Sequence, residues 1–187
     1  TRAIQIAVPG READDVIAHL CQVHGPTAKD GVRVHTVDRD LIVLQTDKVK
    51  VDVKPLKVVM DNTDHSKDVE IPAADVPLYK ALVGDPSDVI PGMPKFGPKA
   101  FVTCDRRLLQ IAFDALCTGT ATPAAFVAAG VKEAMAERMC EPEQAELLRT
   151  YAKVIAFMPM PGDWDQHVVA GTPNQTLGDE LLKRFHH

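Results

Sequence analysis

The sequence contains little that would tie the chain to an oxidising compartment or to a membrane. Its four cysteines stand far apart among 187 residues and form no C-x-x-C pair, which argues against a disulfide framework or a zinc ribbon. No apolar run reaches membrane-spanning length, and the first residues do not resemble a signal peptide. We therefore expect a cytoplasmic protein with no membrane partner, and we expect the four cysteines to lie in the hydrophobic core.

An excess of positive charge is also absent. The formal net charge is −5, so the chain as a whole does not attract nucleic acid. Any binding to nucleic acid must come from local basic patches or from metal ions that neutralise the acidic residues. Hydrophobic residues make up 45% and charged residues 25%, as in ordinary globular proteins of one core.

The first part of the chain alternates between strand and helix patterns. Strands are expected over 3–8, 32–37 and 48–54, and helices over 11–25 and 38–45. This alternation is typical of a parallel α/β sheet. His35 falls within a predicted strand, and we expect it to pack in the core. The polar segment 55–77 predicts a loop or the tip of a hairpin.

The second part of the chain is predicted to be helical. Apolar residues recur at spacings of three and four over 76–84, 99–104, 105–116, 123–140 and 141–158, which indicates helices. A tail rich in proline and glycine follows over 159–179, before a last short helix over 180–187. We expect Trp164 to anchor this tail.

Acidic residues gather where predicted strands and helices end. One group follows the first strand, another follows the second strand, and a third follows the helix over 76–84. In chain order they are Glu12, Asp14, Asp15, Asp38, Asp40, Asp85 and Asp88. Because ligands of open parallel sheets bind beyond the carboxyl ends of the strands, the first two groups are expected to share one crevice.

Carboxylates gathered in one crevice would repel one another unless cations neutralised them. Ligand sets made only of oxygen suit Mg²⁺ or Mn²⁺, and a pair of such ions is a recurrent device for in-line attack on a phosphodiester. Each acidic group by itself also fits an ordinary helix start or a solvated turn. Taken together, the three groups favour a two-metal site whose nucleophile is a metal-bound water.

The segment "PGMPKFGPKA", residues 91–100, predicts a turn between two helices that faces a phosphate. Gly92 and Gly97 allow positive φ angles and the close approach of a nucleic-acid backbone. Lys95 and Lys99 add positive charge beside a helix N-terminus. Arg106 and Arg107 follow the turn and are candidates to extend this phosphate track.

These residues resemble the 5′-nucleases, the 5′-3′ exonucleases and flap endonucleases of phage and bacterial type. The resemblance rests on "EADD" at 12–15, "TVDRD" at 36–40 and "LVGDPSDVIPGMPKFGPK" at 82–99, and it extends to about residue 115. It implies an α/β fold, with part of a PIN-like parallel sheet over 1–75. It also implies a helical DNA-binding region over 76–187, with a helix-three-turn-helix and an α-helical C-terminal extension.

The resemblance also implies roles for individual residues. The acidic residues would hold two Mg²⁺ or Mn²⁺ ions, with Asp38, Asp40 and Asp85 as the catalytic members. The helix-three-turn-helix would grip DNA, and in this family it also binds a potassium ion through backbone carbonyls. The implied DNA-binding residues are Gly92, Lys95, Gly97, Lys99, Arg106 and Arg107.

Two departures from the family pattern concern the turn and the front of the chain. Val89 stands where the family has asparagine, and Pro94 or Lys95 stands where it has a second glycine, which could alter the turn or the potassium site. The part of the nuclease domain that precedes "EADD" in the family is missing from these residues. We therefore expect the missing N-terminal part of the same domain to act as a partner. Because the end of the chain leaves no room for a polymerase domain, we also expect a stand-alone nuclease.

The sequence thus predicts a metal-dependent 5′-3′ exonuclease or flap endonuclease, which hydrolyses DNA phosphodiesters near 5′ ends or flaps by a two-metal mechanism. A PIN-type ribonuclease would explain the acidic residues but not the glycine–lysine turn. A module that binds structured DNA without cutting it stays a second alternative, because the part of the nuclease domain that precedes "EADD" is missing from these residues.

Overall fold

The computed structural model describes residues 4–171, which form two compact units. The described part of the first unit consists of 4–20 and 158–171, and the second unit consists of 21–157. Helix α1 (Ala13–His24) begins in the first unit and ends in the second. The short helix predicted over 180–187 lies outside the described residues. The boundary predicted near residue 75 divides the chain by function and stays a prediction.

The first unit contains a two-stranded sheet. Strand β1 (Ile4–Ile6) pairs antiparallel with β6 (Val168–Ala170), so the first strand does not join the parallel sheet in which we expected it. Its partner lies in the tail that looked irregular, because a run of three apolar residues is too short to signal a strand. The edge of the Trp164 ring meets the ring of His19 at 4.8 Å between centroids, so the prediction that Trp164 anchors the tail is confirmed.

The second unit opens with a small parallel sheet. Strand β2 (Val32–Val34) pairs in parallel with β3 (Val49–Val51), and the 3₁₀ helix η1 (Asp40–Leu44) lies between them in the chain. The parallel pairing and the short helix were both expected. The core position expected for His35 is wrong: β2 ends one residue earlier, and the His35 side chain is 74% exposed, with Nδ1 2.7 Å from Asp52.

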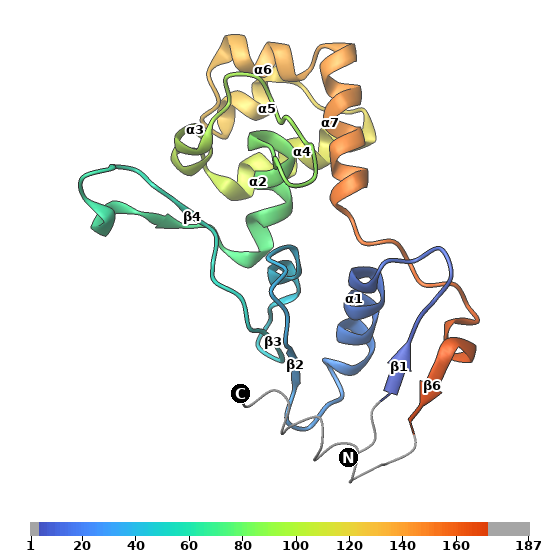
Figure 1. The fold of residues 1–187 in the computed structure, drawn as a ribbon. Helices are drawn as coiled ribbons and strands as arrows, with labels where there is room; N and C mark the ends of the chain where they lie inside the picture. Colours follow the sequence, from blue (N-terminus) through green and yellow to red (C-terminus); the bar gives the residue numbers. More distant parts are fainter. Residues whose placement is uncertain (1–3, 172–187) are drawn as a thin grey trace. The chain divides into compact units, whose positions relative to one another are not determined.

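A hairpin occupies the polar segment, as predicted. Strands β4 (Lys57–Val58) and β5 (Val69–Glu70) pair antiparallel, with the 3₁₀ helix η2 (His65–Lys67) at the tip. Lys67 at this tip makes ion pairs with Asp61 and Asp64, at 3.4 and 3.1 Å. The hairpin projects from the helical part of the same unit (Figure 1).

Helices form the rest of the second unit. After the short 3₁₀ helix η3 (Ala73–Asp75), the chain forms α2 (Val76–Val83), α3 (Pro98–Thr103), α4 (Arg106–Thr118), α5 (Pro123–Ala128), α6 (Glu133–Met139) and α7 (Pro142–Ile155). The single helix predicted over 123–140 is therefore two helices. The break contains Gly130, whose φ of +97° belongs to a conformation that glycine adopts readily.

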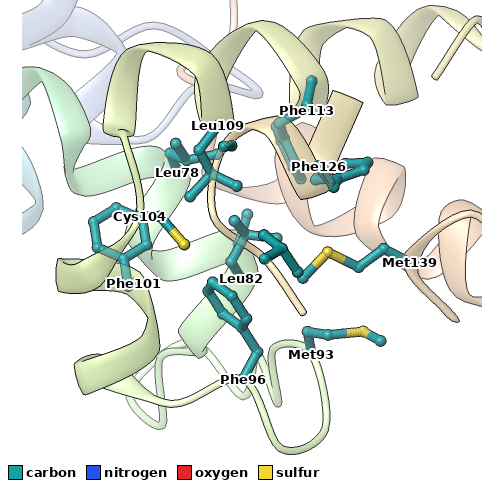
Figure 2. Packing of buried hydrophobic residues seen from close by; sticks show 14 of the residues in the cluster. Leu78, Leu82, Met93, Phe96, Phe101, Cys104, Leu109, Phe113, Phe126 and Met139 are labelled. Carbon is teal, nitrogen blue, oxygen red and sulfur yellow. The ribbon is translucent and has the colours of Figure 1, made fainter. Parts of the chain in front are cut away.

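One hydrophobic core joins these helices and fixes the end of α2. Leu82, Phe101 and Phe126 have no exposed surface, and Figure 2 shows them in the same cluster as Cys104. Cys117, in contrast, is exposed on α4, so the prediction that all four cysteines are buried is wrong. No helix in the part of the chain that the structure describes is long and apolar enough to cross a membrane.

Candidate active site

The loop that follows α2 has a defined local structure. Gly84 ends the helix with φ of +102°, and Asp85 and Ile90 then form an antiparallel bridge through two hydrogen bonds of 2.8 and 2.9 Å. One carboxylate oxygen of Asp85 accepts hydrogen bonds from the backbone N–H and the hydroxyl of Ser87, at 2.9 and 2.5 Å. The short segment "GDPSDVI" is therefore a closed loop in which Asp85 has a fixed orientation.

Three of the predicted acidic residues converge at this loop. Asp40 comes from the start of η1, and Asp85 and Asp88 come from the loop after α2. One oxygen atom of each carboxylate lies within 4.8 Å of the corresponding oxygen atoms of the other two. Asp40 and Asp85 are half-buried and Asp88 is exposed, so the cluster is open to solvent on the side of Asp88.

An ammonium group lies among these three carboxylates. Nζ of Lys80, in α2, is 2.5 Å from Asp40, 2.5 Å from Asp85 and 3.2 Å from Asp88. The Lys80 side chain is only 11% exposed. Because an ammonium has three N–H donors, the three carboxylates account for all of them.

The pKa values of this cluster move in different directions. Burial alone would lower the pKa of Lys80, but hydrogen bonds and the charges of Asp40 and Asp85 outweigh it, so the pKa is raised and the ammonium stays charged. Burial raises the pKa of Asp40 in spite of Lys80. Burial would also raise the pKa of Asp85. Hydrogen bonds from Lys80 and Ser87 outweigh it, so the pKa of Asp85 is lowered. These two aspartates differ because the charges of Asp88 and Asp38 add to the effect of burial on Asp40, whereas Ser87 gives Asp85 further hydrogen bonds.

Asp38 lies next to the cluster without joining the three-oxygen group. It is exposed, and its carboxylate accepts the backbone N–H of Asp40 at 3.0 Å. Its charge also raises the pKa of Asp40. In this arrangement Asp38 orients the first residue of η1, which carries the carboxylate that reaches Lys80.

The remaining predicted acids belong to the other unit. Asp15 is buried, and its two oxygens accept backbone N–H groups of Glu12 and Met158 at 3.0 and 2.7 Å. Asp15 therefore holds the start of α1 and the returning chain near Met158. Glu12 is exposed and Asp14 is half-buried. The role of these three residues as metal ligands stays a prediction.

The two predicted glycines of the turn differ in backbone conformation and in the space available for a Cβ atom. Gly92 is buried with φ of +69°, and a Cβ there would lie 2.4 Å from the carbonyl carbon of Val83. Gly97 has φ of −93°, and a Cβ there would meet nothing within 4 Å. The backbone of the turn therefore needs glycine at position 92, whereas nothing in this unit explains glycine at position 97.

Basic residues gather after the turn. Lys95 and Lys99 are exposed, and together with Lys132, from the segment before α6, they line a cavity of about 330 Å³. Arg107 is exposed on α4. Nε of Arg106 is 3.0 Å from Asp75, so this carboxylate already offsets the charge that Arg106 would offer a phosphate.

Two residues of this region were not predicted from the sequence. Lys80 is the only charged residue of α2 and lies one turn before Gly84. A single charge on an otherwise uncharged helix indicates an oppositely charged partner nearby. Lys132 lies 33 positions after Lys99 in the chain, and only the packing of α3 with the α5–α6 break brings it to the cavity. No local sequence pattern could have found it.

About half of the chain or more is similar to known proteins. Over 98 residues the chain is 34% identical to a 5′-3′ exonuclease of Aquifex aeolicus, covering 52% of this chain and 33% of that protein. It is 39% identical over 97 residues to a thermostable DNA polymerase I of Thermus thermophilus, and 34% identical over 117 residues to a DNA polymerase I of Deinococcus radiodurans. The covered shares are 51% and 62% of this chain, and 11% and 12% of those proteins.

The resemblance predicted from the motifs is thus confirmed by relatives that are named 5′-3′ exonuclease and DNA polymerase I. No family model matches the chain. The chain spans about a third of the length of the exonuclease and about a tenth of the length of the polymerases. Since relatives of both names occur, the expectation of a stand-alone nuclease stays a prediction.

Proposed function

We propose that this chain is part of a metal-dependent 5′-3′ exonuclease or flap endonuclease that hydrolyses DNA phosphodiesters near 5′ ends or flaps. The observation that carries the proposal is the convergence of Asp40, Asp85 and Asp88 at a loop that leads directly into a turn lined by Lys95 and Lys99. The similarity to a protein named 5′-3′ exonuclease supports the same conclusion.

The donor set fits a hard divalent cation. Asp40, Asp85 and Asp88 offer only carboxylate oxygens, and their spacing allows one cation to contact all three. Mg²⁺ and Mn²⁺ prefer such ligands, with water completing the coordination. When bound, such ions lower the pKa of a water and stabilise the negative charge that develops at phosphorus. A second ion, held with Glu12, Asp14 or Asp15, is part of the proposal.

The chain's own residues perform the other tasks. Asp38 orients η1, and Ser87 orients Asp85, so the acidic side chains are held in place by hydrogen bonds. Lys95 and Lys99 supply positive charge for a DNA strand, and potassium binding at the turn is a further element of the proposal. An overall charge of −5 would otherwise oppose DNA binding.

The test is Mn²⁺-dependent cleavage of a 5′-labelled flap, compared among wild type, Asp85→Asn and Asp114→Asn. We expect Asp85→Asn to lower the cleavage rate about a hundredfold or more, because it removes a ligand of the charge-stabilising ion, while binding of the flap is retained. Asp114 is exposed on α4 and pairs with Gln110, so Asp114→Asn is the control and should cleave as wild type does.

The assay needs the longest protein that contains this sequence, in addition to the chain by itself, because the matched exonuclease is about three times as long as the matched region. Cleavage of RNA but not of DNA would favour a ribonuclease. Tight flap binding by every variant without any cleavage would favour a module that only binds DNA. Either result would refute the proposed function.

A further inference from the structure

Lys80 occupies the position that a metal ion would need. Its ammonium contacts one oxygen each of Asp40, Asp85 and Asp88, and oxygens of these same three residues form the group that lies within 4.8 Å. A divalent ion bonded to that group would sit about 2.0–2.1 Å from each oxygen in the case of Mg²⁺. The space at the centre of the cluster cannot hold both cations.

Electrostatics makes the two cations competitors even if they sit side by side. Like charges a few ångströms apart repel strongly where water is partly excluded, and the Lys80 side chain is only 11% exposed. The ammonium also uses all three of its donors on the three carboxylates, so a metal that takes these oxygens deprives it of its partners.

Lys80 also has a route out of the cluster. Its stem has four methylene groups and rotates freely compared with the fork of an arginine. The Asp88 side chain is 39% exposed, so the ammonium can move past it into solvent while the stem stays packed in α2. Two of the three carboxylates have supports other than the ammonium, since Ser87 holds Asp85 and Asp40 belongs to η1.

We propose that Lys80 is an internal counter-ion that competes with the divalent cation for Asp40, Asp85 and Asp88. In the absence of metal it offsets one of the three negative charges and so reduces the repulsion among the carboxylates. It thereby weakens metal binding, and it sets the metal concentration at which the site fills. This inference rests on the proposed function only for the nature of the cation.

The test compares Mn²⁺ binding by wild type and Lys80→Met in the absence of DNA, by titration calorimetry. Methionine keeps the length of the stem and removes the charge. We expect Lys80→Met to bind Mn²⁺ about tenfold more tightly or better, because a like charge beside the ion is gone. The control is Lys67→Met, which removes the lysine that pairs with Asp61 and Asp64 in the hairpin, and which should leave Mn²⁺ affinity unchanged.

Unchanged or weaker Mn²⁺ binding by Lys80→Met would overturn the proposal. Thermal unfolding gives a second reading: Mn²⁺ should stabilise Lys80→Met at concentrations that do not yet stabilise wild type. If Lys80→Met and Lys80→Gln both fail to fold even at saturating Mn²⁺, the ammonium is a structural tie that a metal cannot replace, and the proposal is wrong. Tighter binding by Lys80→Met without flap cleavage by any protein would instead refute the proposed function alone.

Discussion

Val89 and Lys95 hold a backbone conformation that residues with a Cβ seldom adopt. Among residues 4–171 these are the non-glycine residues with positive φ, at +57° and +70°. Val89 is the less suited of the two, because a β-branched side chain crowds the backbone in this region. Its side chain gains nothing in return, since it is 87% exposed. Asparagine and glycine adopt such angles at lower cost than valine or lysine do.

We predict that Val89→Gly raises the free energy of unfolding by about 1 kcal/mol, because the strain removed exceeds the entropy that glycine adds to the unfolded chain. Urea unfolding followed by circular dichroism measures the change. Val37 is 99% exposed and does not have positive φ, so Val37→Gly is the matched control and should leave stability unchanged or lower it. Equal effects of the two substitutions would show that Val89 is not strained.

Residue patterns predicted the three acids that the structure brings together, among others that it does not, but they did not predict the ammonium group that lies among them. The spacing of Asp85 and Asp88 and the position of Asp40 were visible in the sequence, and the structure brings these three together. Lys80 was overlooked, because a lysine in a helix is usually a solvated residue. Its burial depends on the packing of α2 against the rest of the core, and that packing cannot be derived from a pattern of nine residues.

The element that joins the acidic cluster to the basic residues is the turn between α2 and α3. Met93 donates its N–H to the carbonyl of Leu82 at 2.7 Å, so the turn folds back onto the last turn of α2. Gly92 makes this possible by its contact with the backbone of Val83. Gly97 directly precedes α3, and a Cβ there would meet nothing within 4 Å, which is the environment expected where another molecule approaches closely.

We predict that the two glycine-to-alanine substitutions affect different properties, namely stability for Gly92 and DNA binding for Gly97. Gly92→Ala is expected to destabilise the protein by about 2 kcal/mol or more, because alanine is strained at positive φ and its Cβ overlaps the backbone of Val83. Gly97→Ala should leave the unfolding midpoint unchanged and weaken flap binding, as measured by fluorescence anisotropy. Normal flap binding by a folded Gly97→Ala protein would show that DNA does not approach this position closely.

Most elements of the second unit follow from local patterns, and the first unit shows where such patterns fail. The helices after residue 76, the hairpin and the parallel pairing of β2 with β3 were expected. The pairing of β1 with β6 was not, since it joins segments more than 160 positions apart, and contacts at such separation leave no local periodicity. The break at Gly130 was missed because apolar spacing continues across it.

At the scale of the whole molecule, charge is divided unevenly. The net charge is −5, yet Lys95, Lys99 and Lys132 line one cavity, and Lys80 is committed to the acidic cluster. A DNA strand would therefore meet local positive charge on a chain that repels it elsewhere. Such binding must depend on salt, because each neutralised phosphate releases counterions.

We predict that the double variant Lys95→Met, Lys99→Met binds double-stranded flap DNA with a smaller salt dependence. The slope of log K against log salt concentration should fall in magnitude by about 1.8, since each phosphate contact contributes about 0.9. Methionine keeps the straight side chain at both positions, so the turn should fold as before. Lys153 is exposed on α7, and Lys153→Met is the control that should keep the wild-type slope. A double variant with the wild-type slope would mean that the phosphate contacts lie on other residues, and the basic cavity would then have no part in DNA binding.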